Sequence, residues 1–342
     1  MNIWFNHWFS TAVHLIRLMR AAGGDLRFLG TSTNPRALYR EAVDVWEDEP
    51  EFAADDDYVQ WALTFCRTHD VDVFVPRRRL AAIVEAREAF AALGVRLFAP
   101  DDGALVHALD DKDATYKLLQ SWGLDALVPP YRMVHSLDAF RAAVDELQRT
   151  GARVCYKLAV DEGATTFRVM DDRLVEPSAL WTMPGAKVTR AAAEAILGAY
   201  DFHIPVLVLP YLMGPEISVD ALHATQGDIL LPRYKGGRYS TLRWEADIVA
   251  LSTKLLRHLA MRVPVNLQFR MHEGRPYLLE INPRMAGGLQ LSCAATGINV
   301  PAIALAQLVG REMPWRMPQE KEITVANLET PLVLEKGASL HE

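Results

Sequence analysis

The chain has 342 residues, of which 50% are hydrophobic and 23% are charged. This balance is typical of a globular protein with a sizeable core, and it excludes a disordered chain. Three cysteines are too few to frame a disulfide scaffold, and a formal charge of −7 gives no basic footprint for a nucleic acid. The longest apolar run, residues 204–213, is too short for a membrane span and contains two prolines. We expect a cytoplasmic protein with no signal peptide and no membrane or nucleic-acid partner.

The first hundred residues alternate between strand and helix signals. Apolar runs predict strands at 2–5, 26–30 and 71–75, and helices at 11–22 and 80–93. The acidic segment 47–57 is typical of a surface loop. Strands separated by helices indicate a parallel sheet with helices on its faces. We therefore predict an α/β domain over residues 1–108.

Polar and basic residues follow two of these strands, at the edge where parallel sheets bind ligands. Residues 6–10 follow the first strand, and Arg77, Arg78 and Arg79 follow the third. Adjacent arginines could hold a carboxylate or phosphate by forked hydrogen bonds, whereas a solvated helix start is the alternative for two of the three. We retain Ser10, Arg77 and Arg78 as candidate substrate residues. His7 could also contact a substrate, although packing is favoured.

From about residue 109 the pattern changes to helices mixed with antiparallel strands, an α+β arrangement. The predicted helices are 111–122, 137–150 and 244–261, and Ser136 is the expected N-cap of the second. The predicted strands are 154–158, 167–170, 206–209, 265–271 and 275–281, with a hairpin at 216–221 and 228–231 and a strand pair at 321–335. A domain boundary is expected after residue 108.

One polar constellation points to a metal site. Gln268 stands within one predicted strand, and Glu280, Asn282 and Arg284 alternate out of the next. Side chains two apart on a strand share a face, so these oxygens converge if the two strands pair. Carboxylate and amide oxygens suit Mg²⁺, and an arginine suits a transferring phosphoryl group. The alternative is a polar strand at a sheet edge, against which neighbouring apolar residues favour a central strand.

Residues 278–288, LLEINPRMAGG, resemble the metal-binding end of the ATP-grasp fold, in its carbamoyl-phosphate-synthetase-like version. The resemblance extends over 109–312 and implies two lobes, 109–205 and 206–312, behind the N-terminal domain, with a tail at 313–342. It implies two metal ions, Mg²⁺ with Mn²⁺ as a substitute, on Gln268, Glu280 and Asn282. It also implies ATP contacts at Lys112, Lys157, Gly163, Thr165, Thr166, Leu209, Tyr211, Leu212 and Glu216.

Within this resemblance, Lys112 and Lys157 are the phosphate lysines and 161–166 is the flap over the phosphates. The hinge 209–216, LPYLMGPE, meets adenine through its backbone and ribose through Glu216. Three features depart from the family pattern. Leu158 replaces a common proline, the flap contains a single glycine, and Leu209 stands where many members have a glutamate facing the adenine amino group. The flap is therefore expected to be stiffer, and selection of ATP over GTP would depend on backbone groups.

At finer grain, residues 1–10, 74–78, 155–157 and 278–288 resemble the ATP-grasp branch found in biosynthetic operons linked to tellurium-resistance (Ter) genes. The resemblance implies a carboxylate–amine ligase, less readily a thiol ligase. The enzyme would activate a carboxylate as an acyl phosphate, with Arg284 and Lys157 as catalytic residues. Its partners would be a small carboxylate and an amine, in a possible homodimer. A silent ATP-binding module and a small-molecule kinase are the alternatives.

The remaining candidates are basic residues and cysteines. Arg233, Lys235 and Arg238, with Arg243 nearby, could form a positive wall around an anionic acceptor. Cys155 and Cys293 could act as nucleophiles, but no histidine lies near either in sequence, so packed thiols are favoured.

Overall fold

The computed structural model describes residues 1–161, 163–181, 183–328 and 331–332. Its contacts divide the chain into two compact units. Unit 1 comprises Met1–His107, Glu216–Gln268 and Ile281–Glu342. Unit 2 comprises Ala108–Pro215 and Phe269–Glu280. Each unit therefore combines segments that are distant in sequence.

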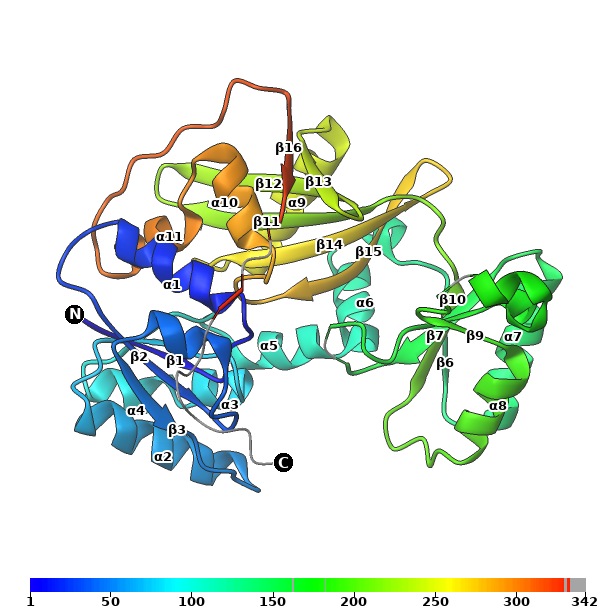
Figure 1. Ribbon diagram of the computed structural model, residues 1–342, viewed down its shortest axis with the longest axis horizontal. Helices are drawn as coiled ribbons and strands as arrows, with labels where there is room; N and C mark the ends of the chain where they lie inside the picture. Colours follow the sequence, from blue (N-terminus) through cyan, green and yellow to red (C-terminus); the bar gives the residue numbers. More distant parts are fainter. Residues whose placement is uncertain (162, 182, 329–330, 333–342) are drawn as a thin grey trace. The chain divides into compact units, whose positions relative to one another are not determined.

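The N-terminal part of unit 1 contains a parallel sheet, as predicted, but the sheet has five strands where three were predicted (Figure 1). The strand order is β3-β2-β1-β4-β5, with β1 (Asn2–Asn6), β2 (Arg27–Ser32), β3 (Val45–Asp48), β4 (Val73–Val75) and β5 (Arg96–Leu97). All four neighbouring pairs are parallel. Trp4 is fully buried, with its ring centroid 3.9 Å from that of Phe74. The order reverses between β1 and β4, so the loops after these two strands flank the switch point of the sheet.

Two predictions about the N-terminal helices were wrong. The segment 47–57 is not simply a loop: it holds the end of β3 and the start of α2 (Asp55–Thr68). Three aspartates in the first turn of α2 favour a helix there, because carboxylates stabilise the positive end of the helix dipole. The predicted helix 80–93 is two helices, α3 (Leu80–Glu85) and α4 (Arg87–Ala92), separated at Ala86. Helix α1 (Ala12–Ala21) formed as expected.

A second sheet of six strands has the order β15-β14-β11-β12-β13-β16. Its strands are β11 (Glu216–Ala224), β12 (Gly227–Gly236), β13 (Tyr239–Arg243), β14 (Val265–His272), β15 (Arg275–Asn282) and β16 (Glu322–Ala326). β14 and β15 are joined through Glu273 and Gly274, both with positive φ, which is the geometry of a two-residue hairpin turn. The expectation that β15 is central was wrong: it is an edge strand whose apolar residues, Leu278 and Ile281, are buried.

Three helices accompany this sheet: α9 (Ala246–Leu259), α10 (Leu289–Thr296) and α11 (Val300–Leu308). Helix α1 of the N-terminal part contacts α10 and α11, so the two sheets of unit 1 share one packed body. The tail was predicted as a strand pair, but β16 pairs with β13 instead. Residues 329–330 and 333–335 of that prediction lie outside the described residues.

Unit 2 contains a five-stranded sheet of order β6-β10-β7-β8-β9. Its elements are α6 (Lys112–Ser121), β6 (Arg132–Val134), α7 (Leu137–Arg149), β7 (Val154–Leu158), β8 (Arg168–Met170), β9 (Lys187–Val188), α8 (Arg190–Gly198) and β10 (Val206–Pro210). Ser136 caps α7 as predicted, accepting a hydrogen bond from the N–H of Ala139. Phe140 and Val206 are fully buried in the core of this unit.

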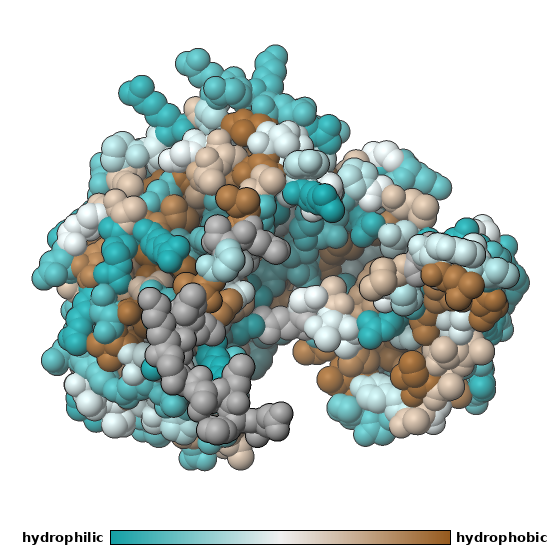
Figure 2. All heavy atoms as spheres, in the orientation of Figure 1, coloured by the Kyte–Doolittle hydropathy of each residue, from teal (hydrophilic) through white to brown (hydrophobic). Residues whose placement is uncertain are grey.

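Between β8 and β9 the chain forms short 3₁₀ turns that expose apolar side chains. Val175, Leu180 and Trp181 are each more than 80% exposed. Figure 2 shows brown, apolar atoms gathered on the visible face of this unit. In the described part of the chain, no single helix is long and apolar enough to span a membrane, and only the bent pair α10 and α11 passes that test jointly.

Candidate functional site

Two lysines of unit 2 are almost fully buried. Lys112 is the first residue of α6 and 4% exposed, and Lys157 lies on β7 and is 8% exposed. Asp111 caps α6, accepting hydrogen bonds from the N–H groups of Asp113 and Ala114 at 2.7 and 3.1 Å. This cap fixes the backbone that carries Lys112. Lysines are rarely buried without a charged partner, so this pair indicates a site built to meet negative charge.

The charges around these lysines explain how they are held. Nζ of Lys112 donates to Oδ1 of Asp161 at 2.7 Å. Burial, and after it the nearby charge of Lys112, lower the pKa of Lys157 to about 8 against the opposing effect of Glu280 and Asp161. Burial also acts on Asp161, but its hydrogen bonds from Lys112 and Thr166 outweigh this effect and lower its pKa. Lys157 is therefore an ammonium group close to its titration point.

The segment predicted as a flap, residues 161–166, is held by hydrogen bonds of Thr166 to Asp161 and Leu158. Thr166 donates through its hydroxyl to Oδ2 of Asp161 at 2.6 Å and accepts from the N–H of Leu158 at 3.0 Å. Gly163 and Ala164 both have positive φ, a conformation that is strained for alanine. The threonine hydroxyl thus performs a backbone-fixing role in a loop with few glycines. Thr165 is exposed beside it, and residue 162 lies outside the described residues.

The predicted hinge is hydrogen-bonded to the end of β14. The N–H of Gly214 donates to the carbonyl of Met271 at 2.9 Å, and a Cβ on Gly214 would overlap that carbonyl. Tyr211 donates its N–H to the carbonyl of Arg153, and its ring receives the guanidinium of Arg270 at 5.0 Å. Within the described residues 211–214, Leu212 is the residue whose N–H donates to no other group. The hinge therefore presents one backbone donor.

Leu209 precedes this hinge on β10. It pairs with Cys155 of β7 and is 3% exposed, so its side chain belongs to the core of unit 2. No carboxylate stands at this position to contact a base. Leu209 therefore offers a base no side-chain hydrogen bond.

The predicted metal residues lie on the neighbouring strands β14 and β15. Glu280 and Asn282 are two apart on β15 and share a face, and Gln268 lies on β14. All three side chains are partly buried. Among the described residues, no group of three His, Cys, Asp or Glu side chains could hold a metal. One carboxylate and two amide oxygens nevertheless match the oxygen donors of Mg²⁺, which keeps part of its shell for phosphates and water. The donor set fits.

A buried polar cluster of unit 1, formed by Asp220, Asn266 and Ser218, lies next to Gln268 and was not predicted from the sequence. Nε2 of Gln268 donates to Oδ1 of Asn266 at 3.1 Å. Nδ2 of Asn266 donates to Oδ1 of Asp220 and to Oγ of Ser218, both at 2.9 Å. Burial raises the pKa of Asp220, while Arg233 and hydrogen bonds oppose the shift. Asn266 and Gln268 are two apart on one strand and so share a face, and this contact could have been predicted from that spacing.

The three arginines after β4 have different surroundings. Arg78 pairs with Glu49 at 2.9 Å and with Glu51 at 2.6 Å, and Arg79 pairs with Asp55. Both arginines are therefore paired with carboxylates of unit 1, rather than free in solvent as the alternative of a solvated helix start expects. Arg77 instead donates to the carbonyl of His7 at 2.6 Å.

Arg77 also stacks on an aromatic ring that a second arginine shares. Its guanidinium carbon lies 5.4 Å from the ring centroid of Phe9, and that of Arg284 lies 5.3 Å from the same ring. Ser10, the next residue along the loop, is exposed. The loop after β1 thus brings Arg77 and the predicted phosphoryl-binding Arg284 to one place in unit 1.

The residues of the predicted basic wall are dispersed. Arg233 is 5% exposed, and a Cβ on Gly288 would overlap its guanidinium. Lys235 is exposed and pairs with Glu216, while Arg238 is exposed in the turn between β12 and β13. This placement favours a structural role for Arg233 over direct contact with a substrate.

Sequence comparison concerns mainly the C-terminal part of the chain. Residues 203–331 match the model of a family described as ATP-grasp in the biosynthetic pathway with Ter operon. A stretch of 184 residues is 25% identical to the carbamoyl phosphate synthase large chain of Clostridium beijerinckii. Over residues 203–331 the chain is therefore similar to an ATP-grasp family. The matched stretch covers 46% of this chain and 17% of that relative, so the chain spans a small part of its curated relatives' length.

Solved structures share the fold of this chain. One is the biotin carboxylase domain dimer of the Hydrogenobacter thermophilus 2-oxoglutarate carboxylase, in complex with MgADP, ADP and bicarbonate. Its TM-score is 0.63 at 15% identity, covering 92% of this chain and 71% of that one. Another is the L-amino acid ligase of Bacillus licheniformis, with a TM-score of 0.63 at 17% identity, covering 90% and 74%. At these identities the likeness concerns the fold alone.

The cysteines of the chain are packing residues. Cys66, Cys155 and Cys293 are all buried. Burial raises the pKa of Cys155 and Cys293 to about 12, so both remain thiols at neutral pH. Neither is suited to act as a nucleophile.

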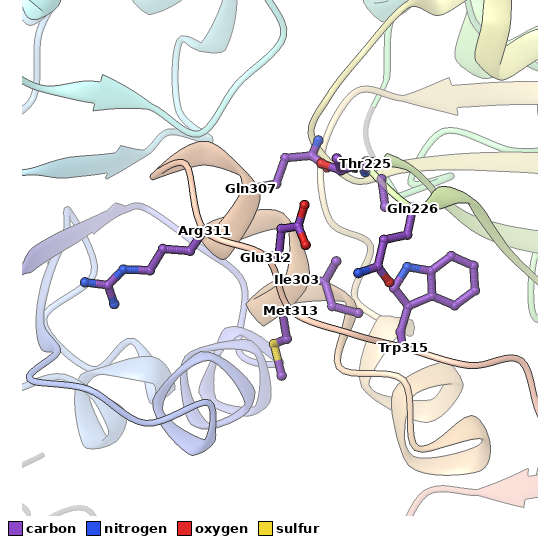
Figure 3. A pocket seen from close by; sticks show the side chains of 9 residues that line it. Thr225, Gln226, Ile303, Gln307, Arg311, Glu312, Met313 and Trp315 are labelled. Atoms are coloured by element: carbon purple, nitrogen blue, oxygen red, sulfur yellow. Dashed lines mark hydrogen bonds between the residues drawn. The ribbon is translucent and has the colours of Figure 1, made fainter.

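Figure 3 shows a shallow pocket between the β11–β12 turn and α11. It lies at the opposite end of β11 from Glu216. Oε1 of Gln307 accepts from the N–H and the hydroxyl of Thr225 at 2.8 and 3.1 Å, and its Nε2 donates to the carbonyl of His223 at 3.0 Å. Both the oxygen and the nitrogen of the Gln307 amide therefore make hydrogen bonds, which hold α11 against the turn. None of the residues found to line this pocket belongs to the predicted site.

Proposed function

We propose that this chain is an ATP-dependent ligase that activates a small carboxylate as an acyl phosphate and joins it to an amine. ADP and phosphate are the other products. The observation that carries the proposal is the arrangement of Gln268, Glu280 and Asn282 on neighbouring strands of an ATP-grasp sheet. Oxygen donors of this kind suit Mg²⁺ held together with substrate phosphates.

In this proposal, catalysis consists of positioning and charge neutralisation, as in phosphoryl transfer generally. Lys112 and Lys157 hold phosphate oxygens as point charges. Arg284 stabilises the charge that develops on the transferring phosphoryl group. Glu216 accepts hydrogen bonds from ribose hydroxyls, and the Gly163–Thr166 loop covers the phosphates. Bound Mg²⁺, held by Gln268, Glu280 and Asn282, would supply further neutralisation of the triphosphate.

The hinge supports a preference for ATP over GTP. The N–H of Leu212 is a donor, and N1 of adenine is an acceptor, whereas N1 of guanine carries a hydrogen. Because Leu209 is apolar and buried, this backbone donor has no side-chain competitor. We expect GTP to bind more weakly than ATP in a direct titration.

For the acceptor we propose a site at the loop after β1. Arg77 and Arg284 flank Phe9, so a carboxylate there would meet two guanidinium groups beside an apolar ring. Arg78 has two acidic partners already and contributes less. Substitution Arg77→Ala should raise the KM for the carboxylate and leave ATP binding unchanged.

One observation favours a silent nucleotide-binding module as the second candidate. The ammonium group of Lys112 is already paired with Asp161, so phosphate must compete with a carboxylate for it. A kinase differs from both, because it would transfer phosphate to the acceptor without requiring an amine.

The experiment that tests the proposed function is phosphate release from Mg-ATP with pooled carboxylates and pooled amines. A ligase releases phosphate only when both pools are present. A kinase consumes ATP with the carboxylate pool alone and leaves the phosphate on a product. Tight ATP binding without consumption in any combination would favour the silent module.

The assembly is a separate question that light scattering would answer. The 2-oxoglutarate carboxylase domain is described as a dimer, and we propose a homodimer for this chain as well. A monomeric mass at working concentration would contradict that part of the proposal.

A further inference from the structure

The amide of Gln268 has one end fixed by a buried neighbour. Its Nε2 donates to Oδ1 of Asn266, whose side chain is completely buried. A glutamine can bind a metal only through its oxygen. When the NH₂ end is held by Asn266, the oxygen is the end left for a cation. The orientation of this amide therefore decides whether Gln268 can be a ligand.

The orientation of Asn266 is fixed in turn by groups that can only accept. Its Nδ2 lies 2.9 Å from Oδ1 of Asp220 and 3.4 Å from the backbone carbonyl of Val219. A flipped Asn266 would set its own oxygen against a carboxylate and a carbonyl in a site closed to water, which is costly. Oδ1 of Asn266 must therefore face Gln268.

Asp220 anchors the other end of this chain of hydrogen bonds. Its Oδ2 accepts from the hydroxyl of Ser292 at 2.6 Å, and the guanidinium of Arg233 lies 3.9 Å away. Asp220, Arg233 and Ser292 are each at most 5% exposed. Gly288 leaves room for the Arg233 guanidinium. The carboxylate is held from two further sides, independently of Asn266.

We propose that Asp220 and Asn266 are positioning residues that set the amide of Gln268 with its oxygen toward the metal. The inference deepens the proposed function and rests on its metal assignment. The Asp220 carboxylate accepts from the NH₂ of Asn266, and the oxygen of Asn266 accepts from the NH₂ of Gln268. The oxygen of Gln268 is the outer end of this relay.

The relay also explains which residue types are compatible at position 268. With Asn266 in place, a carboxylate at 268 would face the Asn266 oxygen and be repelled. Without Asn266, a glutamine loses its fixed orientation, whereas a carboxylate offers an oxygen at either end. The variants Asn266→Ala and Gln268→Glu should therefore be non-additive.

The test is the affinity of the full-length protein for Mn²⁺ in the presence of ADP, measured by electron paramagnetic resonance of free Mn²⁺. Asn266→Ala should weaken Mn²⁺ binding 10–100-fold, the usual effect of losing a residue that orients a metal ligand. The double variant Asn266→Ala, Gln268→Glu should recover most of that loss. Failure of the double variant to bind Mn²⁺ more tightly than Asn266→Ala would overturn the relay.

Two controls separate this proposal from a loss of stability and from the metal assignment. Thr31→Val removes a buried hydroxyl hydrogen bond to Glu49 in the N-terminal sheet, outside this chain of hydrogen bonds, so it should leave Mn²⁺ affinity unchanged. Glu280→Gln must itself weaken Mn²⁺ binding, and if it does not, the metal assignment of the proposed function fails. If Glu280→Gln weakens binding while Asn266→Ala does not, the metal site stands and the relay is wrong.

Should Asn266→Ala fail to fold, Asn266→Ser carries the same expectation. The serine hydroxyl can still donate to Asp220, but it is too short to hold the Gln268 amide as well. Mn²⁺ binding as tight as in the unmodified protein would contradict the proposal.

Discussion

Nζ of Lys112 and Oδ1 of Asp161 lie 2.7 Å apart, and both side chains are at most 5% exposed. Phosphate that binds Lys112 must therefore displace or outcompete this carboxylate. Asp161→Asn keeps an oxygen for the N–H of Thr166 but removes the charge that holds Lys112. We expect the Kd for ADP, measured by calorimetry, to fall about tenfold, which corresponds to about 1.4 kcal/mol.

Thr166→Val is the matched control for this prediction. It removes the hydroxyl contacts at the base of the flap and leaves the ion pair between Lys112 and Asp161 intact. No gain in ADP affinity is expected from it. Weaker ADP binding by the Asp161→Asn protein would show that the carboxylate supports the nucleotide rather than competing with it.

The pKa of Lys157, about 8, predicts a pH dependence of nucleotide binding. Below this pH Lys157 is charged in the free protein, and binding should not depend on its titration. Above it the free protein must take up a proton to present an ammonium group to phosphate, so the Kd for ADP should rise by about tenfold per pH unit. Calorimetry between pH 7 and pH 9.5, in buffers of different ionisation enthalpy, would count that proton.

Lys157→Met provides the comparison. Since methionine is similar in length and does not titrate, the variant should bind ADP more weakly at every pH, without an inflection near pH 8. An unchanged inflection in this variant would assign the titration to another group.

Gly288→Ala tests the packing around Arg233. Gly288 has a φ of −95°, which alanine adopts without strain, and it precedes α10 directly. The backbone therefore accepts the change, but the added Cβ would overlap the buried guanidinium. We expect the free energy of unfolding to fall by about 1–3 kcal/mol, the usual cost of overpacking, in a urea titration.

Gly287→Ala is the neighbouring comparison. A Cβ there would lie 3.2 Å from the hydroxyl of Thr11, at the end of a small side chain, so a smaller loss is expected. If Gly287→Ala and Gly288→Ala lower the free energy of unfolding equally, the loss in Gly288→Ala does not come from overlap with Arg233.

Much of this fold could be predicted because local signals agree with it. Alternating strands and helices gave the parallel sheet, and Ser136 gave the start of α7. The position of β15 could not be predicted, because Leu278 and Ile281 are buried on one side of an edge strand just as they would be in a central one. The partner of β16 depends on the long-range pairing with β13, which has no local signature.

In the candidate site, too, some features have a local signal in the sequence and others do not. Lys112, Lys157 and the metal residues could be proposed from the sequence, because each lies in a short motif of neighbouring residues. The Asp161 contact and the buried role of Arg233 depend on side chains far apart in sequence. Asp220 and Asn266 stayed unnoticed for the same reason, since 46 residues separate two groups that share a hydrogen bond.

The central claim is tested most directly by phosphate release from Mg-ATP in the wild-type and Glu280→Gln proteins side by side. Glutamine keeps the size of the side chain and removes its charge, so the fold should be intact by circular dichroism. We expect release from the wild-type protein only with carboxylates and amines together, and no release above background from the variant. Near-normal release by Glu280→Gln would contradict the metal assignment, and the absence of ATP binding by the wild-type protein would contradict the whole account.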